Sequence, residues 1–180
     1  MKSVLISIQP YWVFLIIAKK LGWNIKQEKT IEVRKSHPKD VNWDKVAKIY
    51  CSQDKKSFSR IPKEYQPLMK QFLGKGIGEF VCDEIKTERP KSLYASHKTV
   101  INCCVPIQEI IDYVGEKNFL YFWHISNLVI YDKPRELNDF YVPVKDYWET
   151  YDPSKYINGC WQKPLTRPPQ SWMYVEEVKE

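Results

Sequence analysis

The chain has 180 residues, of which 43% are hydrophobic and 28% are charged, and its formal net charge is +6. This apolar content excludes a disordered protein, and the length predicts a single domain over residues 1–180. Residues 1–90 carry 18 lysines and arginines against 10 acidic residues, whereas residues 91–180 carry 10 against 12. The positive N-terminal half favours a polyanionic partner, although a lysine-rich solvated surface accounts for it equally well.

Five cysteines without a Cys-x-x-Cys pair predict reduced thiols in a cytoplasmic protein. Their spacing from the three histidines matches no zinc finger, so we expect neither a metal nor a cofactor. The longest apolar run, Tyr11–Ala18, ends at two lysines and is shorter than the roughly 20 residues that a membrane span needs. It predicts a buried helix and no membrane association. We expect a monomer by default.

The first half of the chain reads as strands with two helices. The apolar, β-branched run at Val4–Ile8 is typical of a central strand. Pro10 suits the first turn of a helix and Gly22 suits its end. In chain order, the predicted elements are a strand at Val4–Ile8, a helix at residues 11–21, strands at Glu28–Arg34 and Lys45–Cys51, a polar loop at Ser52–Arg60 and a short helix at Pro62–Leu73.

The second half adds strands around one amphipathic helix. Isoleucine and valine recur at helical spacing after Pro106, and two glycines near the start of a strand predict a bulge or a close backbone approach. The elements are a strand at Gly76–Ile85, a loop at residues 86–104, a helix at Pro106–Val114, a long strand or bent strand pair at Phe119–Tyr131, a helical turn at Pro134–Phe140, a loop with a short helix at Val144–Tyr151 and a last strand at Trp172–Val178. Strands cluster without regular helix alternation, which predicts an α+β fold with a curled, mostly antiparallel sheet and two or three helices.

The segment Lys29-Thr30-Ile31-Glu32-Val33-Arg34 carries the most chemical information. On a strand, Glu32 and Arg34 project from one face with their Cα atoms about 6.6 Å apart. Lys29 is one residue out of phase and joins them only if the strand starts near it or a bulge rotates it. Two cations and a carboxylate in one cleft could hold a phosphate, or polarise a carbonyl while the carboxylate moves a proton. A solvated strand face with ordinary salt bridges is the simpler interpretation.

This pattern, Lys29-x-x-Glu32-x-Arg34 after an entry of the form Leu-Ile-Ser-Ile-Gln-Pro, resembles the signature of the ASCH domain family in the PUA-like superfamily. The usual motif is Gly-x-Lys-x-x-Glu-x-Arg, and Gln27 stands here where Gly is usual. Three further stretches resemble ASCH proteins encoded by phages and prophages, namely Gly76–Glu84, Trp123–Lys133 and Thr166–Val175.

The resemblance implies a β-pseudo-barrel with a cleft for RNA or a nucleotide beside the first helix, floored by Lys29, Glu32 and Arg34. Some relatives are amidohydrolases that deacylate N4-acylated cytidine, and others are nucleases acting on single-stranded RNA. In the amidohydrolase branch, a nucleophilic Thr commonly occupies the position of Glu32. That mechanism therefore does not transfer directly, although Thr30 is expected on the same face.

Seven further residues are candidates for contacting nucleic acid. Lysine and arginine bind phosphates, tryptophan stacks on bases, and histidine exchanges protons near neutral pH. Each residue also has an ordinary alternative as a core aromatic, a sheet histidine, a turn asparagine or a solvated cation. Because neighbouring strand residues face opposite sides, one of Trp123 and His124 should face the core and the other the cleft. The seven are Lys55, Lys56, Trp123, His124, Asn127, Arg167 and Trp172. Arg60, in the same polar loop as the two lysines, could likewise follow a phosphate backbone or be a solvated loop cation.

Three functions follow from these observations. The first is a module that binds RNA or a nucleotide, with aromatic stacking and basic contacts to phosphates. The second is a hydrolase of N4-acylated cytidine or single-stranded RNA in which Lys29 and Glu32 act as acid and base and Arg34 stabilises negative charge. The third is a phage protein-interaction module that uses the aromatic and Pro-rich region Tyr147–Trp172.

Overall fold

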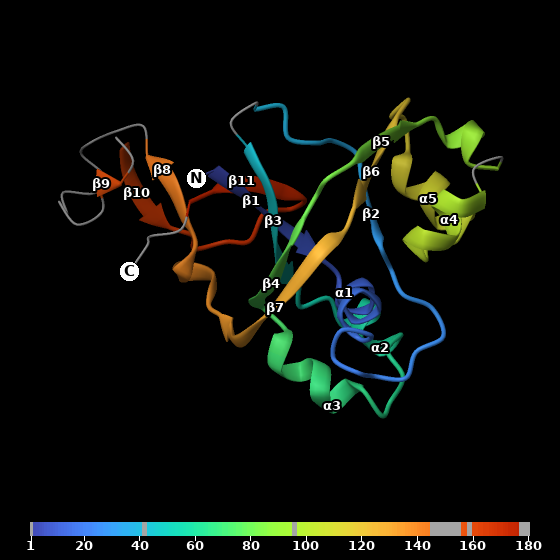
Figure 1. The fold of residues 1–180 in the computed structure, drawn as a ribbon, viewed down its shortest axis with the longest axis horizontal. Coiled ribbons are helices and arrows are strands. Elements are labelled where there is room, and N and C mark those ends of the chain that lie inside the picture. Colours follow the sequence, from blue (N-terminus) through green and yellow to red (C-terminus); the bar gives the residue numbers. More distant parts are fainter. Residues whose placement is uncertain (1, 41–42, 95–96, 145–155, 158–159, 177–180) are drawn as a thin grey trace.

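The structure is a computed structural model that describes residues 2–40, 43–94, 97–144, 156–157 and 160–176 (Figure 1). Its strands form three separate sheets. The largest has the order β11-β1-β3-β4-β7, and only its β1–β3 pair is parallel. These strands span Trp172–Val175 (β11), Lys2–Ile8 (β1), Trp43–Cys51 (β3), Lys75–Val81 (β4) and Ser126–Arg135 (β7).

Two antiparallel three-stranded sheets flank the largest one on opposite sides (Figure 1). The first has the order β2-β6-β5, with bounds Ile31–Arg34, Leu120–His124 and Ile85–Glu88. The second has the order β8-β10-β9, with bounds Tyr141–Val144, Cys160–Pro164 and Tyr156–Ile157. The fold is therefore α+β with mostly antiparallel strands, as predicted, and the sheets do not close into a barrel among the described residues.

The described residues hold five α-helices, where two or three were expected. Their bounds are Pro10–Ile17 (α1), Lys55–Ser59 (α2), Gln66–Met69 (α3), His97–Cys103 (α4) and Ile107–Val114 (α5). Short 3-10 turns lie at Lys70–Phe72 (η1), Pro90–Tyr94 (η2) and Leu137–Asp139 (η3).

The extra helices lie in segments predicted to be loops. The side chain of Asp54 accepts a hydrogen bond from the Ser57 amide, which caps α2 inside the predicted loop Ser52–Arg60. The predicted loop over residues 86–104 contains most of β5, then η2 and α4. All of these elements are at most seven residues long, which is too short for hydrophobic periodicity to reveal them.

The hydrophobic core covers both faces of the largest sheet. Val4 and Ile6 of β1 join the cluster that contains Val13 and Ile17 of α1. Leu5, between them, belongs to a second cluster on the opposite face. Because successive strand residues alternate between faces, an uninterrupted apolar run satisfies a strand that is covered on both sides. The predicted central strand is therefore confirmed.

A third hydrophobic cluster joins β2 and β6 to α4 and α5. Ile31 and Val33 pack there with Cys103, Ile110 and other residues. Figure 1 shows α4 and α5 beside this small sheet, away from the β8-β10-β9 sheet. The other face of β2 carries Glu32 and Arg34, and it is buried too. The simpler interpretation, a solvated strand face with ordinary salt bridges, is therefore wrong, because other parts of the protein cover that face.

Candidate functional site

The ionic motif begins just before β2, at a point where the backbone is tied to two helices. The amide of Lys29 donates to the Leu15 carbonyl at 3.0 Å, and the amide of Thr30 donates to the Asn102 carbonyl at 3.0 Å. Because the strand starts only at Ile31, Lys29 is outside the strand alternation. Its side chain can therefore reach the face that carries Glu32.

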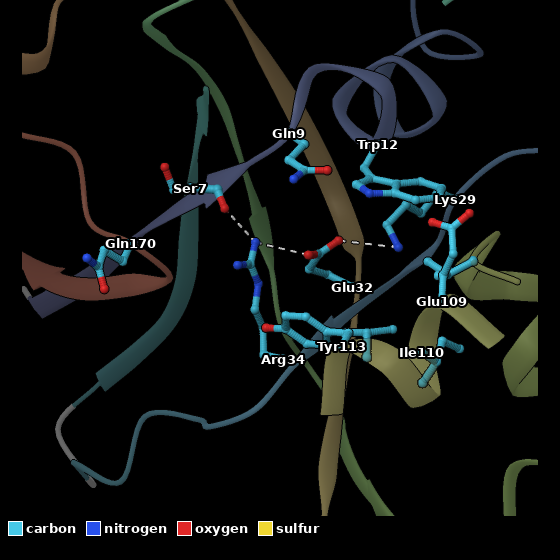
Figure 2. A pocket seen from close by; sticks show the side chains of 12 residues that line it. Ser7, Gln9, Trp12, Lys29, Glu32, Arg34, Glu109, Ile110, Tyr113 and Gln170 are labelled. Carbon is cyan, nitrogen blue, oxygen red and sulfur yellow. Dashed lines mark hydrogen bonds and ion pairs between the residues drawn. The ribbon is translucent and has the colours of Figure 1, made fainter. Parts of the chain in front are cut away.

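Lys29, Glu32 and Arg34 form a row of buried charges with the carboxylate in the middle (Figure 2). Oε2 of Glu32 is 3.3 Å from Nζ of Lys29, and Oε1 is 3.0 Å from Nη2 of Arg34. Each of the three residues is at most 7% exposed. Water screens such pairs little, so the interaction is stronger than a surface salt bridge, and loss of one member would leave an uncompensated buried charge.

The Lys29 ammonium has three N–H groups and three polar partners. Nζ donates to the carbonyls of Ile31 and Cys103, both at 2.7 Å, and faces Glu32. It also lies 5.5 Å from the centre of the Trp12 ring. Lys29 therefore connects α1, β2 and the end of α4 in addition to placing a positive charge.

The Arg34 guanidinium links the small sheet to the end of β1. Nη2 donates to the carbonyl of Ser7 at 2.7 Å, in addition to its contact with Glu32. Nε of Arg34 and Oε2 of Glu32 are both buried and have no hydrogen-bond partner among the described residues. Oε2 still has its ion pair with Lys29 at 3.3 Å, so the carboxylate is held by charge on both sides.

The row of charges forms the floor of a cavity of about 290 Å³ between β1, α1, β2 and α5 (Figure 2). Trp12 of α1 lies on one side and Tyr113 of α5 on another. The lining residues are Ser7, Gln9, Trp12, Lys29, Glu32, Val33, Arg34, Val105, Glu109, Ile110, Tyr113 and Gln170. Its volume is near the lower end of the roughly 300–1,000 Å³ usual for small-molecule sites, which suits a ligand the size of one nucleobase or nucleoside.

Tyr113 is a wall residue with one ring face already occupied. Nζ of Lys35 lies 4.7 Å from its ring centre, and 39% of the residue remains exposed. Partial burial raises the pKa of the Tyr113 hydroxyl above its usual value, although the charge of Arg34 opposes the shift. The phenol therefore stays protonated at neutral pH and can donate a hydrogen bond.

The two candidate tryptophans are not at the cavity. Trp123 is fully buried in the main core, where its ring centre lies 5.9 Å from that of Trp43 and 6.1 Å from that of Trp172. Trp172 is half-buried in β11, and its Nε1 donates to the Ser36 hydroxyl at 3.0 Å. Both rings serve packing because β6 and β11 present these positions to the core.

His124 and Asn127 also lie away from the cavity. His124, at the end of β6, is half-exposed, and its Nδ1 lies 2.6 Å from Oδ1 of Asp83. This hydrogen bond lowers the pKa of the Asp83 carboxyl. Asn127 is exposed near the start of β7 with a φ of 47°, a left-handed conformation that asparagine tolerates. Neither side chain lines the cavity.

The three remaining cationic candidates are exposed and line no part of the cavity. Lys55 and Lys56 occupy the first turn of α2, and Arg167 lies between β10 and β11. The structure therefore brings together Lys29, Glu32 and Arg34, and it leaves the other seven candidates outside their cavity.

Sequence reasoning missed the residues that form the walls of the cavity. Glu109 and Tyr113 are four residues apart on α5, so they share one helix face, and the pair is visible in the sequence. Gln9 and Trp12 lie on either side of Pro10 at the start of α1, directly after β1. Gln170 had no sequence signal, because it reaches the cavity only through the pairing of β11 with β1.

Within the described segments, no His, Cys, Asp or Glu side chains form a group of three that could hold a metal ion. No helix found there is long and apolar enough to cross a membrane.

The fold and the cavity define an α+β protein with a small polar pocket between its largest sheet and a helix-covered side sheet. Among solved proteins, the ASCH protein from Zymomonas mobilis shares this fold, at 16% identity and a TM-score of 0.50, over 97% of this chain and 87% of that chain. A Tyr-to-Phe mutant of that protein gives a TM-score of 0.52 over 98% of this chain and 91% of that chain, also at 16% identity. The chain therefore has the ASCH fold. No protein-family model matches the sequence, and a search of curated proteins finds no match.

Proposed function

We propose that this protein binds RNA or a nucleotide by taking one nucleobase into the cavity above Lys29, Glu32 and Arg34. The observation that carries the proposal is a buried row of two cations and a carboxylate at the floor of a pocket with aromatic walls. Three buried charges are expensive to maintain, and replacing such groups by apolar residues is often neutral or stabilising. Their placement at the floor of a pocket supports a role in binding.

The floor matches the edge of a nucleobase. The Watson–Crick edge of each nucleobase presents hydrogen-bond donors and acceptors next to one another. Glu32 supplies acceptor oxygens and Arg34 supplies donor N–H groups at the cavity, so the two residues match both kinds of group on such an edge. Hydrogen bonds to charged groups contribute about 1.5–3 kcal/mol, which favours a ligand that pairs with them.

The wall formed by Tyr113 is suited to stacking. Lys35 lies over its ring, and the residue is partly exposed where it lines the cavity. Stacking of a base on an aromatic side chain contributes about 1–3 kcal/mol per base in single-stranded RNA recognition. This arrangement favours an unpaired base over a duplex, in which the base faces are covered.

A hydrolase is the second candidate. The carboxylate of Glu32 lines the cavity and could accept a proton from water or substrate. Lys29, in contrast, already directs its ammonium protons to two carbonyls and a carboxylate. Thr30 is not among the cavity-lining residues. Hydrolysis would therefore depend on Glu32. Residues 147–155 and 158–159 of the interaction module proposed for Tyr147–Trp172 lie outside the described residues.

The test compares two aromatic residues that differ mainly in their relation to the cavity. Tyr113 is 39% exposed under Lys35, and Phe119 is 40% exposed with Arg89 over its ring, but only Tyr113 lines the cavity. We expect labelled single-stranded RNA to bind the native protein, Tyr113→Ala to weaken binding about tenfold, and Phe119→Ala to leave it unchanged. Fluorescence anisotropy measures the affinity. Equal effects of both variants would contradict the proposal.

The same samples decide between binder and hydrolase. The native protein and Glu32→Gln are incubated with N4-acetylcytidine and with single-stranded RNA, and products are followed by chromatography. Product formed by the native protein but not by Glu32→Gln would establish the hydrolase. Binding without product supports the binding module.

A further inference from the structure

Arg60 lies beside the cavity and is held on three sides. It is the C-terminal cap of α2, and its guanidinium carbon is 4.4 Å from the ring centre of Tyr11 and 4.7 Å from that of Trp12. Its Nη1 and Nη2 each lie 3.3 Å from one carboxylate oxygen of Glu109, so the pair is bidentate. Trp12 and Glu109 both line the cavity. Arg60 is therefore a cation at the edge of the pocket, paired across it with α5.

The position of this guanidinium is set by the docking of α2 on α1. The amide of Tyr11 donates to the Ser57 hydroxyl at 3.0 Å, and Ser57 is buried. Ile61, the next residue after Arg60, is 2% exposed and belongs to the main core. Arg60 thus projects from a fixed backbone, so less conformational entropy is lost when it binds a ligand.

The charges that line the cavity cancel one another. Lys29 and Arg34 supply two positive charges, and Glu32 and Glu109 supply two negative charges. The cavity itself therefore suits a neutral, polar group such as a nucleobase and leaves the charge of a phosphate uncompensated. Arg60 is a cation adjacent to this neutral pocket, and its guanidinium is already oriented toward an anion.

Resting on the proposed function, we propose that Arg60 binds the phosphate of the ligand whose base fills the cavity, and that Glu109 occupies the guanidinium until that phosphate replaces it. The planar fork of arginine binds phosphate oxygens in the same bidentate manner as it binds a carboxylate. Glu109 thereby distinguishes phosphorylated ligands, which can displace it, from nucleosides, which cannot.

Replacement of Glu109 by a phosphate on Arg60 has a low energetic cost. Arg60 and Glu109 have side chains that are 37% and 45% exposed, and exposed ion pairs contribute only about 0.2–1 kcal/mol. Glu109 also lies in the first turn of α5, where the helix dipole stabilises a carboxylate without a cationic partner. The phosphate therefore gains a charge-assisted contact, and the released carboxylate keeps a favourable position.

The experiment measures three ligands against four proteins by isothermal titration calorimetry. The ligands are a nucleoside, its 5′-monophosphate and a single-stranded RNA tetranucleotide. The proteins are the native chain, Arg60→Gln, Glu109→Gln and Lys63→Gln, an exposed cation three residues further along that lines no part of the cavity. We expect Arg60→Gln to lower the affinity for the phosphorylated ligands about tenfold. Glu109→Gln should raise the affinity for the same ligands severalfold. Arg60→Gln should leave the affinity for the nucleoside unchanged, and Lys63→Gln should match the native chain with all three ligands.

The outcomes separate this inference from the function on which it rests. Suppose that the native protein binds the ligands, but that Arg60→Gln changes the affinity for nucleoside and phosphorylated ligands equally or changes neither affinity. The role of Arg60 is then overturned, and the base-binding cavity stands. If the native protein binds none of the ligands, both fall. A gain in affinity for Glu109→Gln cannot result from misfolding, which keeps the test valid even if Arg60→Gln is unstable. An effect on the tetranucleotide alone assigns the phosphate to an RNA strand, and an effect on the monophosphate as well assigns it to the bound nucleotide.

Discussion

Glu32 has one carboxylate oxygen toward each of two buried cations, so its charge has a structural role as well as the proposed role in binding. Lys29 and Arg34 lie 3.3 and 3.0 Å from it, and both are nearly inaccessible to water. Lys29 in turn satisfies two backbone carbonyls. A variant that removes Lys29 therefore perturbs folding and ligand binding together, and substitutions at the cavity walls separate the two effects better.

We expect Glu32→Ala to lower the free energy of unfolding by about 3 kcal/mol or more, because it leaves two uncompensated positive charges in a buried site. Glu32→Gln retains the shape and one acceptor oxygen and should lose less. Urea unfolding followed by circular dichroism measures both. A loss below 1 kcal/mol for Glu32→Ala would show that water reaches these charges more freely than the structure indicates.

At the scale of single elements, β4 depends on glycine for its close contact with β7. A Cβ atom on Gly78 would collide with the backbone carbonyl of Val129, and the β4–β7 register shifts between Gly76 and Gly78. The sequence prediction of a bulge or close approach at these two glycines is confirmed. Because the atom in the way belongs to the backbone, no side-chain movement can relieve the collision.

Gly78→Ala should therefore destabilise the protein by about 2–3 kcal/mol, as overpacking of a core usually does. Gly22→Ala provides the matched control, because Gly22 has a φ of +74° but no atom within 4 Å of an added Cβ. It should cost only the roughly 1 kcal/mol of a left-handed alanine. Chemical denaturation compares the two variants, and equal losses would mean that contact with Val129 is not the limiting factor.

At the scale of the whole molecule, three cysteines are distributed through the cores as small apolar side chains. Cys51 and Cys82 belong to the main core and Cys103 to the core beside β2. Burial raises the pKa of Cys51 to about 12 and that of Cys82 to about 12, although the charge of Lys45 opposes the shift at Cys82. In an unfolded chain, a thiol has a pKa of about 8.5.

Stability should therefore fall as the pH rises from about 9 toward 12. In that window, the unfolded chain loses thiol protons that the folded chain keeps, so deprotonation favours the unfolded state. Each such thiol contributes up to about 1.4 kcal/mol per pH unit. Urea unfolding at pH 8, 9 and 10 with a reductant measures the slope. Lysines and tyrosines also titrate in this window, so the native chain is compared with Cys51→Ala, whose unfolding free energy should fall less steeply with pH. Identical slopes for the two proteins would contradict a raised pKa of the Cys51 thiol.

The order of the longer elements and the spacing of the ionic motif were determined by the sequence alone. Strands β1 and β3 and helix α5, which are seven to nine residues long, follow the predicted segments, because an apolar run or a helical repeat of this length is a local property. The strand pair within Phe119–Tyr131 was also foreseen. Short elements such as α2 and α4 were not, because a cap or a packing contact decides them.

Only the tertiary structure decided what covers the polar face of β2 and which residues surround it. Trp12, Glu109 and Tyr113 come from helices that are separated by almost a hundred residues in the chain, and their approach depends on two sheets meeting along one cavity. The same packing placed Trp123 in the core and His124 outside the cavity. Burial depends on long-range contacts, and this is the physical reason why the sequence could supply the charged residues but not their pocket.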